Sequence, residues 1–175
     1  MATVIDGSAS VTVNSGAVLG ITSGTAVAST SGTSIDFTGI PSWVKRVTVM
    51  FNGVSTNGSS IVLIQIGTSS GIQNTSYVSA GWTGNTTTTA QTTGFTTAGI
   101  GGATYLLRGN AMLCLADSSS GIWTYSSMFY QEVASTMCFG GGTKTLSGTL
   151  DRIRITTVNG TDTFDAGSIN ILYEG

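Results

Sequence analysis

Short apolar runs with a period of two constrain the fold of this chain more than any other feature. In residues 46–53, Val47, Val49 and Phe51 alternate with side chains that are polar or flexible. Successive side chains of a strand point to opposite faces, so this run predicts a strand with one buried face. Residues 61–66 are almost continuously apolar, which is typical of a strand covered on both faces or lying centrally between two layers.

The segment between these two runs is built around Asn57-Gly58, a dipeptide that tolerates positive φ. It predicts that residues 46–53 and 61–66 form a hairpin. Single helical turns are expected only around Pro41 and Glu132, the first because proline suits the first position of a helix. Further strands are expected at residues 34–38, 76–82, 104–116, 121–131, 143–148, 151–158 and 168–173.

The composition agrees with an all-β fold. There are 25 glycines and one proline in 175 residues, and the valine, isoleucine and aromatic residues gather in the predicted strands. Many short strands separated by turns are typical of a sandwich or barrel, and the length suits one domain. We predict a single antiparallel β-sandwich, jelly-roll-like, over residues 33–175, preceded by an extended N-terminal arm over residues 1–32. Residues 81–102 are low in complexity and predict a long surface loop or a pair of exposed strands.

The charge content restricts the functions that the chain can have. Six basic residues, eight acidic residues and no histidine leave little of the usual inventory for proton transfer and metal ligation. No basic run is present to neutralise a phosphate backbone, so we expect no nucleic-acid partner. No stretch of about 18 consecutive apolar residues occurs, so we expect no insertion into a membrane. The N-terminal residues lack the pattern of a secretory signal.

Motifs that resemble catalytic or cofactor sites are incomplete. Residues 67–71 match the Gly-x-Ser-x-Gly pattern of a nucleophile elbow, but with no histidine as base the pattern predicts a turn. The glycine runs at 140–145 and 99–104 lack the spacing and the following helix of phosphate-binding loops, so both are predicted to be loops. We expect no catalytic residue and no cofactor.

Carboxylates and cysteines give weak signals of their own. Asp162 and Asp165 offer oxygen ligands, but their spacing does not match a calcium loop, so no metal is expected. A polysaccharide hydrolase that acts through these two carboxylates is the enzymatic alternative. Cys114 and Cys138 lie in strand-like segments and are predicted to be reduced residues of the core.

Aromatic side chains supply the candidate contacts. Trp82, with Tyr77 before it and Asn85 after it, places an aromatic ring among amide and hydroxyl groups. Such a surface can stack on a sugar ring, so Tyr77, Trp82 and Asn85 are the candidate ligand or receptor contacts; alternatively Trp82 closes the edge of the core. Trp43 and Trp123 are predicted to lie in the core or in a subunit contact.

One predicted strand, residues 121–131, carries large side chains on both faces. Only one face of such a strand can point into the core, so we expect the other to meet a neighbouring subunit. The two sets are Ile122, Met128 and Tyr130 on one face and Trp123, Tyr125 and Phe129 on the other.

Two blocks of the sequence resemble a known family. The block that begins Ser34-Ile-Asp-Phe-Thr-Gly-Ile-Pro and runs to Ser59, and the block at residues 146–174, are similar to β-rich modules of tailed-bacteriophage and prophage structural proteins. The resemblance implies a virion surface protein of tail-fibre or decoration type, commonly trimeric, without a known catalytic residue. Since only about 33 residues precede the first block, a stand-alone protein is favoured over a fibre with a long shaft.

The family resemblance therefore sets the functional expectations. We expect a homotrimer that is made in the host cytoplasm and incorporated into the virion, with phage capsid or tail proteins as partners. The first reading is a capsid decoration (cement) or head-fibre module. The alternative is a tail-fibre tip that binds a host-surface glycan.

Overall fold

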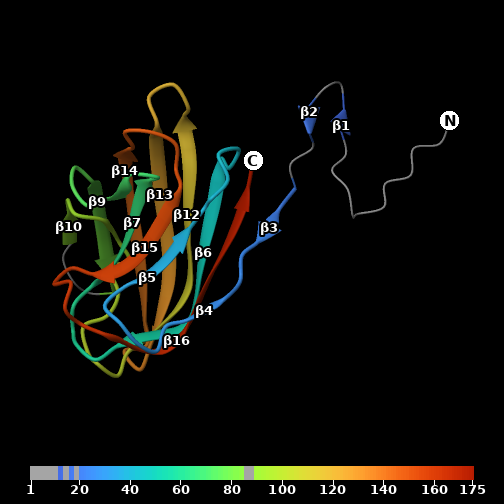
Figure 1. The fold of residues 1–175 in the computed structure, drawn as a ribbon. Coiled ribbons are helices and arrows are strands. Elements are labelled where there is room, and N and C mark those ends of the chain that lie inside the picture. The colour runs from blue at the N-terminus through green and yellow to red at the C-terminus, as the bar shows by residue number, and fades with distance from the viewer. Residues whose placement is uncertain (1–11, 14–15, 18–19, 85–88) are drawn as a thin grey trace.

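The computed structural model describes residues 12–13, 16–17, 20–84 and 89–175, which form antiparallel sheets packed as a β-sandwich (Figure 1). Within these ranges no helix is long and apolar enough to cross a membrane. The strands are β1 (Thr12–Val13), β2 (Gly16–Ala17), β3 (Thr22–Ser23), β4 (Val27–Ala28), β5 (Ile35–Thr38), β6 (Arg46–Thr56), β7 (Val62–Thr68), β8 (Gly71–Gln73), β9 (Val78–Thr83), β10 (Thr89–Gln91), β11 (Phe95–Thr96), β12 (Leu106–Asp117), β13 (Ile122–Glu132), β14 (Thr136–Thr145), β15 (Arg152–Thr157) and β16 (Phe164–Glu174).

The large sheet has the strand order β10-β9-β14-β13-β12-β6-β16, and its outer edge is extended by β3 and β4. Both short strands pair with β16, and the backbone N–H groups of Gly24 and Ser29 donate to the carbonyls of Ile171 and Gly167 at 2.7 and 3.0 Å. Residues 20–32 of the predicted arm therefore border the sandwich, whereas most of residues 1–19 lie outside the described part of the chain.

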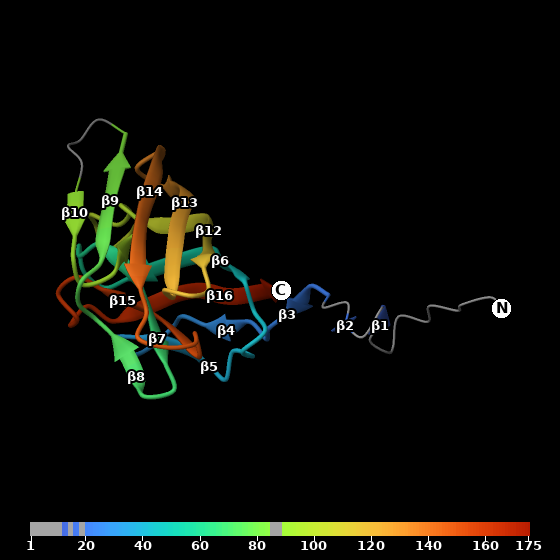
Figure 2. The same cartoon turned by 90° about the horizontal axis from the view of Figure 1, so that it is seen from above.

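The small sheet has the order β11-β7-β15-β5, with β8 also pairing with β7. Figure 2 shows β9, β14 and β13 on one side of the molecule and β7, β8 and β5 on the other. Every residue of β7 is buried, which confirms that this apolar run is covered on both faces. The cover on its outer face includes Thr93, whose carbonyl accepts a hydrogen bond from Gln65 Nε2 at 2.9 Å.

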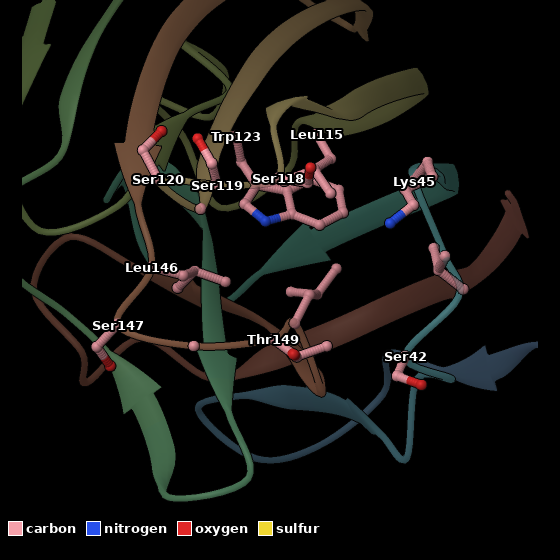
Figure 3. A pocket seen from close by; sticks show the side chains of 14 residues that line it. Ser42, Lys45, Leu115, Ser118, Ser119, Ser120, Trp123, Leu146, Ser147 and Thr149 are labelled. Carbon is pink, nitrogen blue, oxygen red and sulfur yellow. The ribbon is translucent and has the colours of Figure 1, made fainter.

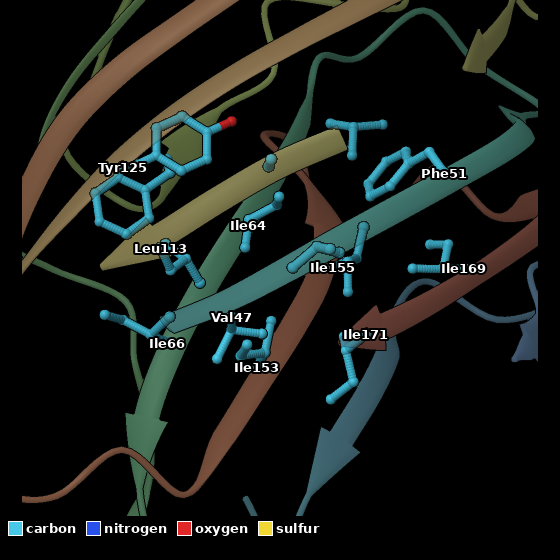
Figure 4. Close-up of a cluster of buried hydrophobic side chains, with 14 of the residues drawn as sticks. Val47, Phe51, Ile64, Ile66, Leu113, Tyr125, Ile153, Ile155, Ile169 and Ile171 are labelled. Atoms are coloured by element: carbon cyan, nitrogen blue, oxygen red, sulfur yellow. The ribbon is translucent and has the colours of Figure 1, made fainter. Parts of the chain in front are cut away.

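The core fills the space between the two sheets (Figure 4). Val47, Val49 and Phe51 of β6 are buried, which confirms the predicted period of two. They belong to the same cluster as isoleucines of β7 and β15, among them the fully buried Ile153 and Ile155. The isoleucine-rich runs thus form the layer that holds the sheets together.

The predicted hairpin between β6 and β7 is wrong, because the two strands belong to different sheets. The chain crosses between the sheets at residues 57–61, where Gly58 does not adopt a positive φ. A second crossover, residues 158–163, lies beside the first. Asn57 N donates to Thr163 O at 2.9 Å, Thr163 N donates to Asn57 Oδ1 at 2.8 Å, and Ser60 N donates to Asp162 Oδ2 at 2.9 Å. These bonds replace the turn that a hairpin would have used.

The glycine run of residues 140–142 lies inside β14 and is not a loop as predicted. A Cβ on Gly140 would come within 3.0 Å of the Thr96 carbonyl oxygen, and one on Gly81 would come within 3.0 Å of the Ala98 Cβ. Residues 95–98 are buried and approach the inner face of the large sheet here, so only glycine leaves room for them. Residues 95–98, in the second half of the low-complexity segment 81–102, thus belong to the core and not to a surface loop. Residues 99–104 form a loop as expected.

The remaining turns correct two predictions and confirm one. Neither predicted helical turn is present: Val44 N donates to Pro41 O at 3.1 Å in a turn, and residues 133–135 form the tight connection between β13 and β14. The Gly-x-Ser-x-Gly segment contains the two-residue turn between β7 and β8, as predicted.

Candidate functional site

The outer face of the large sheet carries a group of exposed, large apolar side chains. We name it the methionine-aromatic patch; its members are Trp82 of β9, Met137 and Phe139 of β14, and Met128 and Tyr130 of β13. The strand register places Trp82 beside Phe139, Phe139 beside Met128, and Met137 beside Tyr130. Their exposed fractions lie between 36% and 54%. The members therefore form one contiguous surface.

Strand alternation explains why these side chains point outward. Within β13, Phe129 is fully buried while its neighbours Met128 and Tyr130 are exposed. The inner positions already fill the core, so the outer ones have no place in it. Single exposed apolar side chains are ordinary, but a contiguous group marks an interaction surface.

The two rings at the β9 side of the patch are stacked. The ring centroids of Trp82 and Phe139 lie 6.0 Å apart with an angle of 24° between their planes. Beside them is a shallow hollow of about 250 Å³, and the other residues of its lining are Ala80, Gly81, Gly140 and Gly141. Because these neighbours are small, the sides of both rings are accessible from solvent. Such a site suits another apolar side chain or the apolar face of a sugar.

Charges next to the patch are neutralised in pairs. Arg108 of β12 binds Glu132 through Nε at 2.7 Å and donates from Nη1 to Asn52 Oδ1 at 2.9 Å. Further along the same face, Arg46 and Glu174 form a bidentate pair across β6 and β16, and the bonds from Arg46 lower the pKa of Glu174. Both arginines of this face thus have carboxylate partners.

Tyr77 does not belong to this surface, contrary to the prediction. Its side chain is 2% exposed, and its hydroxyl accepts a hydrogen bond from Ile66 N at 2.7 Å. The ring meets Phe95 edge-on at 4.8 Å and lies 5.3 Å from the ammonium of Lys144. Burial raises the pKa of Tyr77. Through its contacts with Ile66 and Phe95, Tyr77 packs against the small sheet, and its side chain is not available to a ligand.

The other predicted contacts have separate outcomes. Trp82 is 45% exposed, so it does not close the edge of the core. Asn85 lies outside the described residues. Trp123 is buried as predicted for a core residue, and Trp43 is partly buried against Tyr173 with ring centroids 5.9 Å apart.

The cysteines and the paired aspartates are placed as follows. Cys138 is buried and free, as predicted, whereas Cys114 is only partly buried. The Asp162 carboxylate accepts hydrogen bonds from Ser60 N and from Asn159 Nδ2, the latter at 2.6 Å, so it braces the crossovers. Asp165 is exposed on β16. Among the residues described, no three of the types His, Cys, Asp and Glu lie together as a metal site would require.

Sequence reasoning identified part of the patch. It placed Met128 and Tyr130 on one face of a strand and expected one of the two faces to meet a neighbour, without choosing between them, and it singled out Trp82. It missed Met137 and Phe139, because the predicted strand began at residue 143. The signal was their alternation with the apolar Cys138, directly before the glycine run.

No protein-family model, curated protein or solved structure matches this chain.

Proposed function

We propose that this chain is a non-catalytic structural protein exposed on the surface of a tailed-phage virion, as a capsid decoration or head-fibre module. It assembles with copies of itself as a homotrimer, and the methionine-aromatic patch is its contact surface. The observation that carries the proposal is the contiguous patch on an otherwise well-packed and charge-poor sandwich.

The chemistry of the patch suits a contact between protein subunits. The central parts of such interfaces are depleted in charge and enriched in tryptophan, tyrosine, phenylalanine and methionine, the residue types found here. Methionine adapts its shape to a partner surface. The neighbouring Arg108 and Glu132 neutralise each other, so a second copy of the chain meets no net repulsion. A second copy is therefore the occupant that we propose.

The position of the two family-like blocks also supports the proposal. Residues 34–59 supply β5 and β6, and residues 146–174 supply β15 and β16. These strands pair with one another, β5 with β15 and β6 with β16. The resembling blocks thus form one paired half of the sandwich, while the intervening segment carries the patch. A shared scaffold with a distinct contact surface suits one member of a family of virion modules.

The self-assembly part is tested by the molar mass in solution, measured by light scattering after gel filtration. We expect the unmodified chain to run as a trimer and Met128→Lys, at the centre of the patch, to run as a monomer. Thr38→Lys is the matched control because it adds the same charge on the exposed face of β5, in the small sheet. A monomeric unmodified chain, or a Met128→Lys variant that stays trimeric, contradicts the assignment of this surface.

The virion part is tested by immunogold labelling of purified phage particles. We expect label at the particle surface, and its position on head or tail separates a decoration protein from a fibre tip. Particles that never carry label rule out a virion protein, whatever the oligomeric state of the purified chain.

A specific observation favours the alternative of a glycan-binding fibre tip: the exposed, stacked ring of Trp82 beside a shallow hollow. In this case the purified protein binds host cells, Trp82→Ala abolishes the binding, and Trp82→Phe retains most of it because a ring remains. Cell binding that is unaffected by Trp82→Ala excludes this use of the patch.

A further inference from the structure

A pocket of about 350 Å³ lies at one end of the sandwich (Figure 3). Its lining comes from Ser42, Val44 and Lys45, from the turn between β12 and β13 with the adjoining ends of these strands, and from residues 146–150. The methionine-aromatic patch includes the opposite end of β13, so the two features are separate. The volume is at the lower end of the range of about 300–1,000 Å³ for small-molecule sites, which indicates a ligand of one ring.

Two hydrogen-bond donors of the pocket are unused within the described part of the chain. Lys45 forms no ion pair there, although each of the four arginines is paired with a carboxylate. Trp123 lies across the inner wall, and its indole N–H has no hydrogen-bond partner among the described residues. In the described part of the chain, Ser127 Oγ is the buried side-chain nitrogen or oxygen without a hydrogen-bond partner. The unpaired indole nitrogen of Trp123 is therefore in contact with solvent. The pocket therefore offers two free hydrogen-bond donors to a ligand, the charged Lys45 ammonium and the neutral Trp123 indole N–H.

The serine turn supplies acceptors on another side of the pocket. Ser119 Oγ and Ser120 Oγ donate their protons to the carboxylate of Asp117, at 2.7 and 2.6 Å. These bonds keep the pKa of Asp117 at about 2, so the carboxylate is charged at neutral pH and its bonds persist. With their protons committed, the two serine oxygens can accept hydrogen bonds from a ligand.

An apolar wall completes the pocket. Leu146 and Leu150 line it and are 4% and 3% exposed, so they are held in place by the core. A rigid apolar wall suits the carbon skeleton of a ring, while the donors and acceptors around it suit polar groups at the rim of that ring.

We propose that this pocket binds a sugar acid, a single pyranose unit that carries a carboxylate. The carboxylate lies against the Lys45 ammonium, one oxygen of the ring or its hydroxyls accepts from the Trp123 indole, and other hydroxyls donate to Ser119 and Ser120. A simple anion uses only Lys45, and a neutral sugar leaves that charge unpaired. The ligand that uses all of these groups has both a carboxylate and hydroxyls. The proposal is independent of the methionine-aromatic patch.

The test follows the indole N–H signals of the ¹⁵N-labelled full chain by NMR during titration. The chain has three tryptophans, and the variants Trp43→Phe and Trp82→Phe assign the Trp123 signal by elimination without changing the pocket wall. The probes are glucuronate and N-acetylneuraminate as two sources of a sugar acid, glucose as the neutral counterpart and acetate as the simple anion. We expect at least one sugar acid to shift the Trp123 signal to saturation, with a Kd in the range of about 1 mM.

A charge variant gives the quantitative check. Lys45→Gln is expected to weaken binding of the sugar acid about three- to fivefold, the effect of losing one partly exposed charged contact. Arg154→Gln, on β15 in the small sheet, removes the same charge away from both the pocket and the patch and is expected to leave binding unchanged.

Three results would overturn the proposal. The first is a Trp123 signal that does not move with either sugar acid at up to about 50 mM, far above the Kd expected of a weak site. The second is an equal response to acetate or glucose. The third is a response confined to the Trp82 signal, which places sugar binding on the patch.

Discussion

Two neighbouring glycines of β14, Gly140 and Gly141, should respond in opposite ways to substitution by alanine. A Cβ on Gly140 would point inward, within 3.0 Å of the Thr96 carbonyl and 2.7 Å from Ser127 Oγ. A Cβ on Gly141 would point outward, with the Tyr125 carbonyl oxygen 3.9 Å away. Neither glycine has a positive φ, so the difference between the two variants isolates the close approach of the buried segment.

The magnitude follows from this geometry. Forcing an extra methyl group into a packed interior costs about 1–3 kcal/mol. The Thr96 carbonyl that must move also accepts the hydrogen bond of Tyr125 Oη at 3.0 Å, so its displacement weakens a buried bond. Replacing glycine by alanine also restricts the unfolded chain, an effect of about 0.4–1 kcal/mol that is common to both variants and cancels when they are compared. We therefore expect Gly140→Ala to be less stable than Gly141→Ala by about 1–3 kcal/mol.

Urea unfolding followed by tryptophan fluorescence measures this difference, with both variants at the same protein concentration because self-assembly shifts apparent stability. A domain of this size loses about 2–4 °C in Tm per kcal/mol, so thermal unfolding should separate the variants by at least about 2 °C. Equal stabilities, or a less stable Gly141→Ala, would refute the inward orientation of Gly140 and with it the packing of residues 95–98 against β14.

Two further predictions concern buried and exposed hydroxyl contacts. Tyr77→Phe leaves the N–H of Ile66 without its partner and should lower the free energy of unfolding by about 1–3 kcal/mol, whereas Tyr130→Phe, on the exposed face, should stay within about 0.5 kcal/mol; urea unfolding distinguishes them. Asp117 should titrate near pH 2 in ¹³C NMR of its carboxyl carbon, because hydrogen bonds from the Ser120 hydroxyl, and then from the hydroxyl and backbone N–H of Ser119, stabilise the charged form. Its folded-state pKa lies below the ordinary 3.8, so its contribution to stability is present above about pH 4 and is lost as the pH falls towards 2. Ser120→Ala should raise this pKa, and an unchanged value would contradict the assigned cause.

The strands themselves were predictable because their signal is local. The alternation in residues 46–53 and the continuous apolar run in residues 61–66 each report burial at their own positions, and both agree with the structure. The connection between them was not predictable, because Asn57-Gly58 fits a hairpin as well as a crossover. The choice depends on Asp162 and Thr163, about a hundred residues away in sequence, which bind the crossover from the side. Single-sequence patterns carry no information on such partners.

The same distinction applies to the patch. An outward face with large side chains was predictable for β13, because only one face of such a strand can point into the core. The pattern did not decide whether this is the face of Met128 and Tyr130 or that of Trp123 and Phe129. Phe139 was hidden by the glycine run that follows it, since glycine ordinarily interrupts strands. In this fold glycine is required within β14, because a distant segment approaches its backbone closely. The exception is a tertiary effect, and so is the resulting position of Phe139.

Lys45 differs from the other basic residues of the chain in that its charge has no role in the fold. The four arginines are each bound to a carboxylate, so their charges serve the fold. Lys144, the other lysine, is buried over the ring of Tyr77, and burial lowers its pKa, so its ammonium packs with the core. Lys45 is exposed at the rim of a pocket, and within the described residues it has no carboxylate partner. In a chain with six basic residues, a charge that the fold does not use, lining the same pocket as an unused indole N–H, is best explained by a ligand.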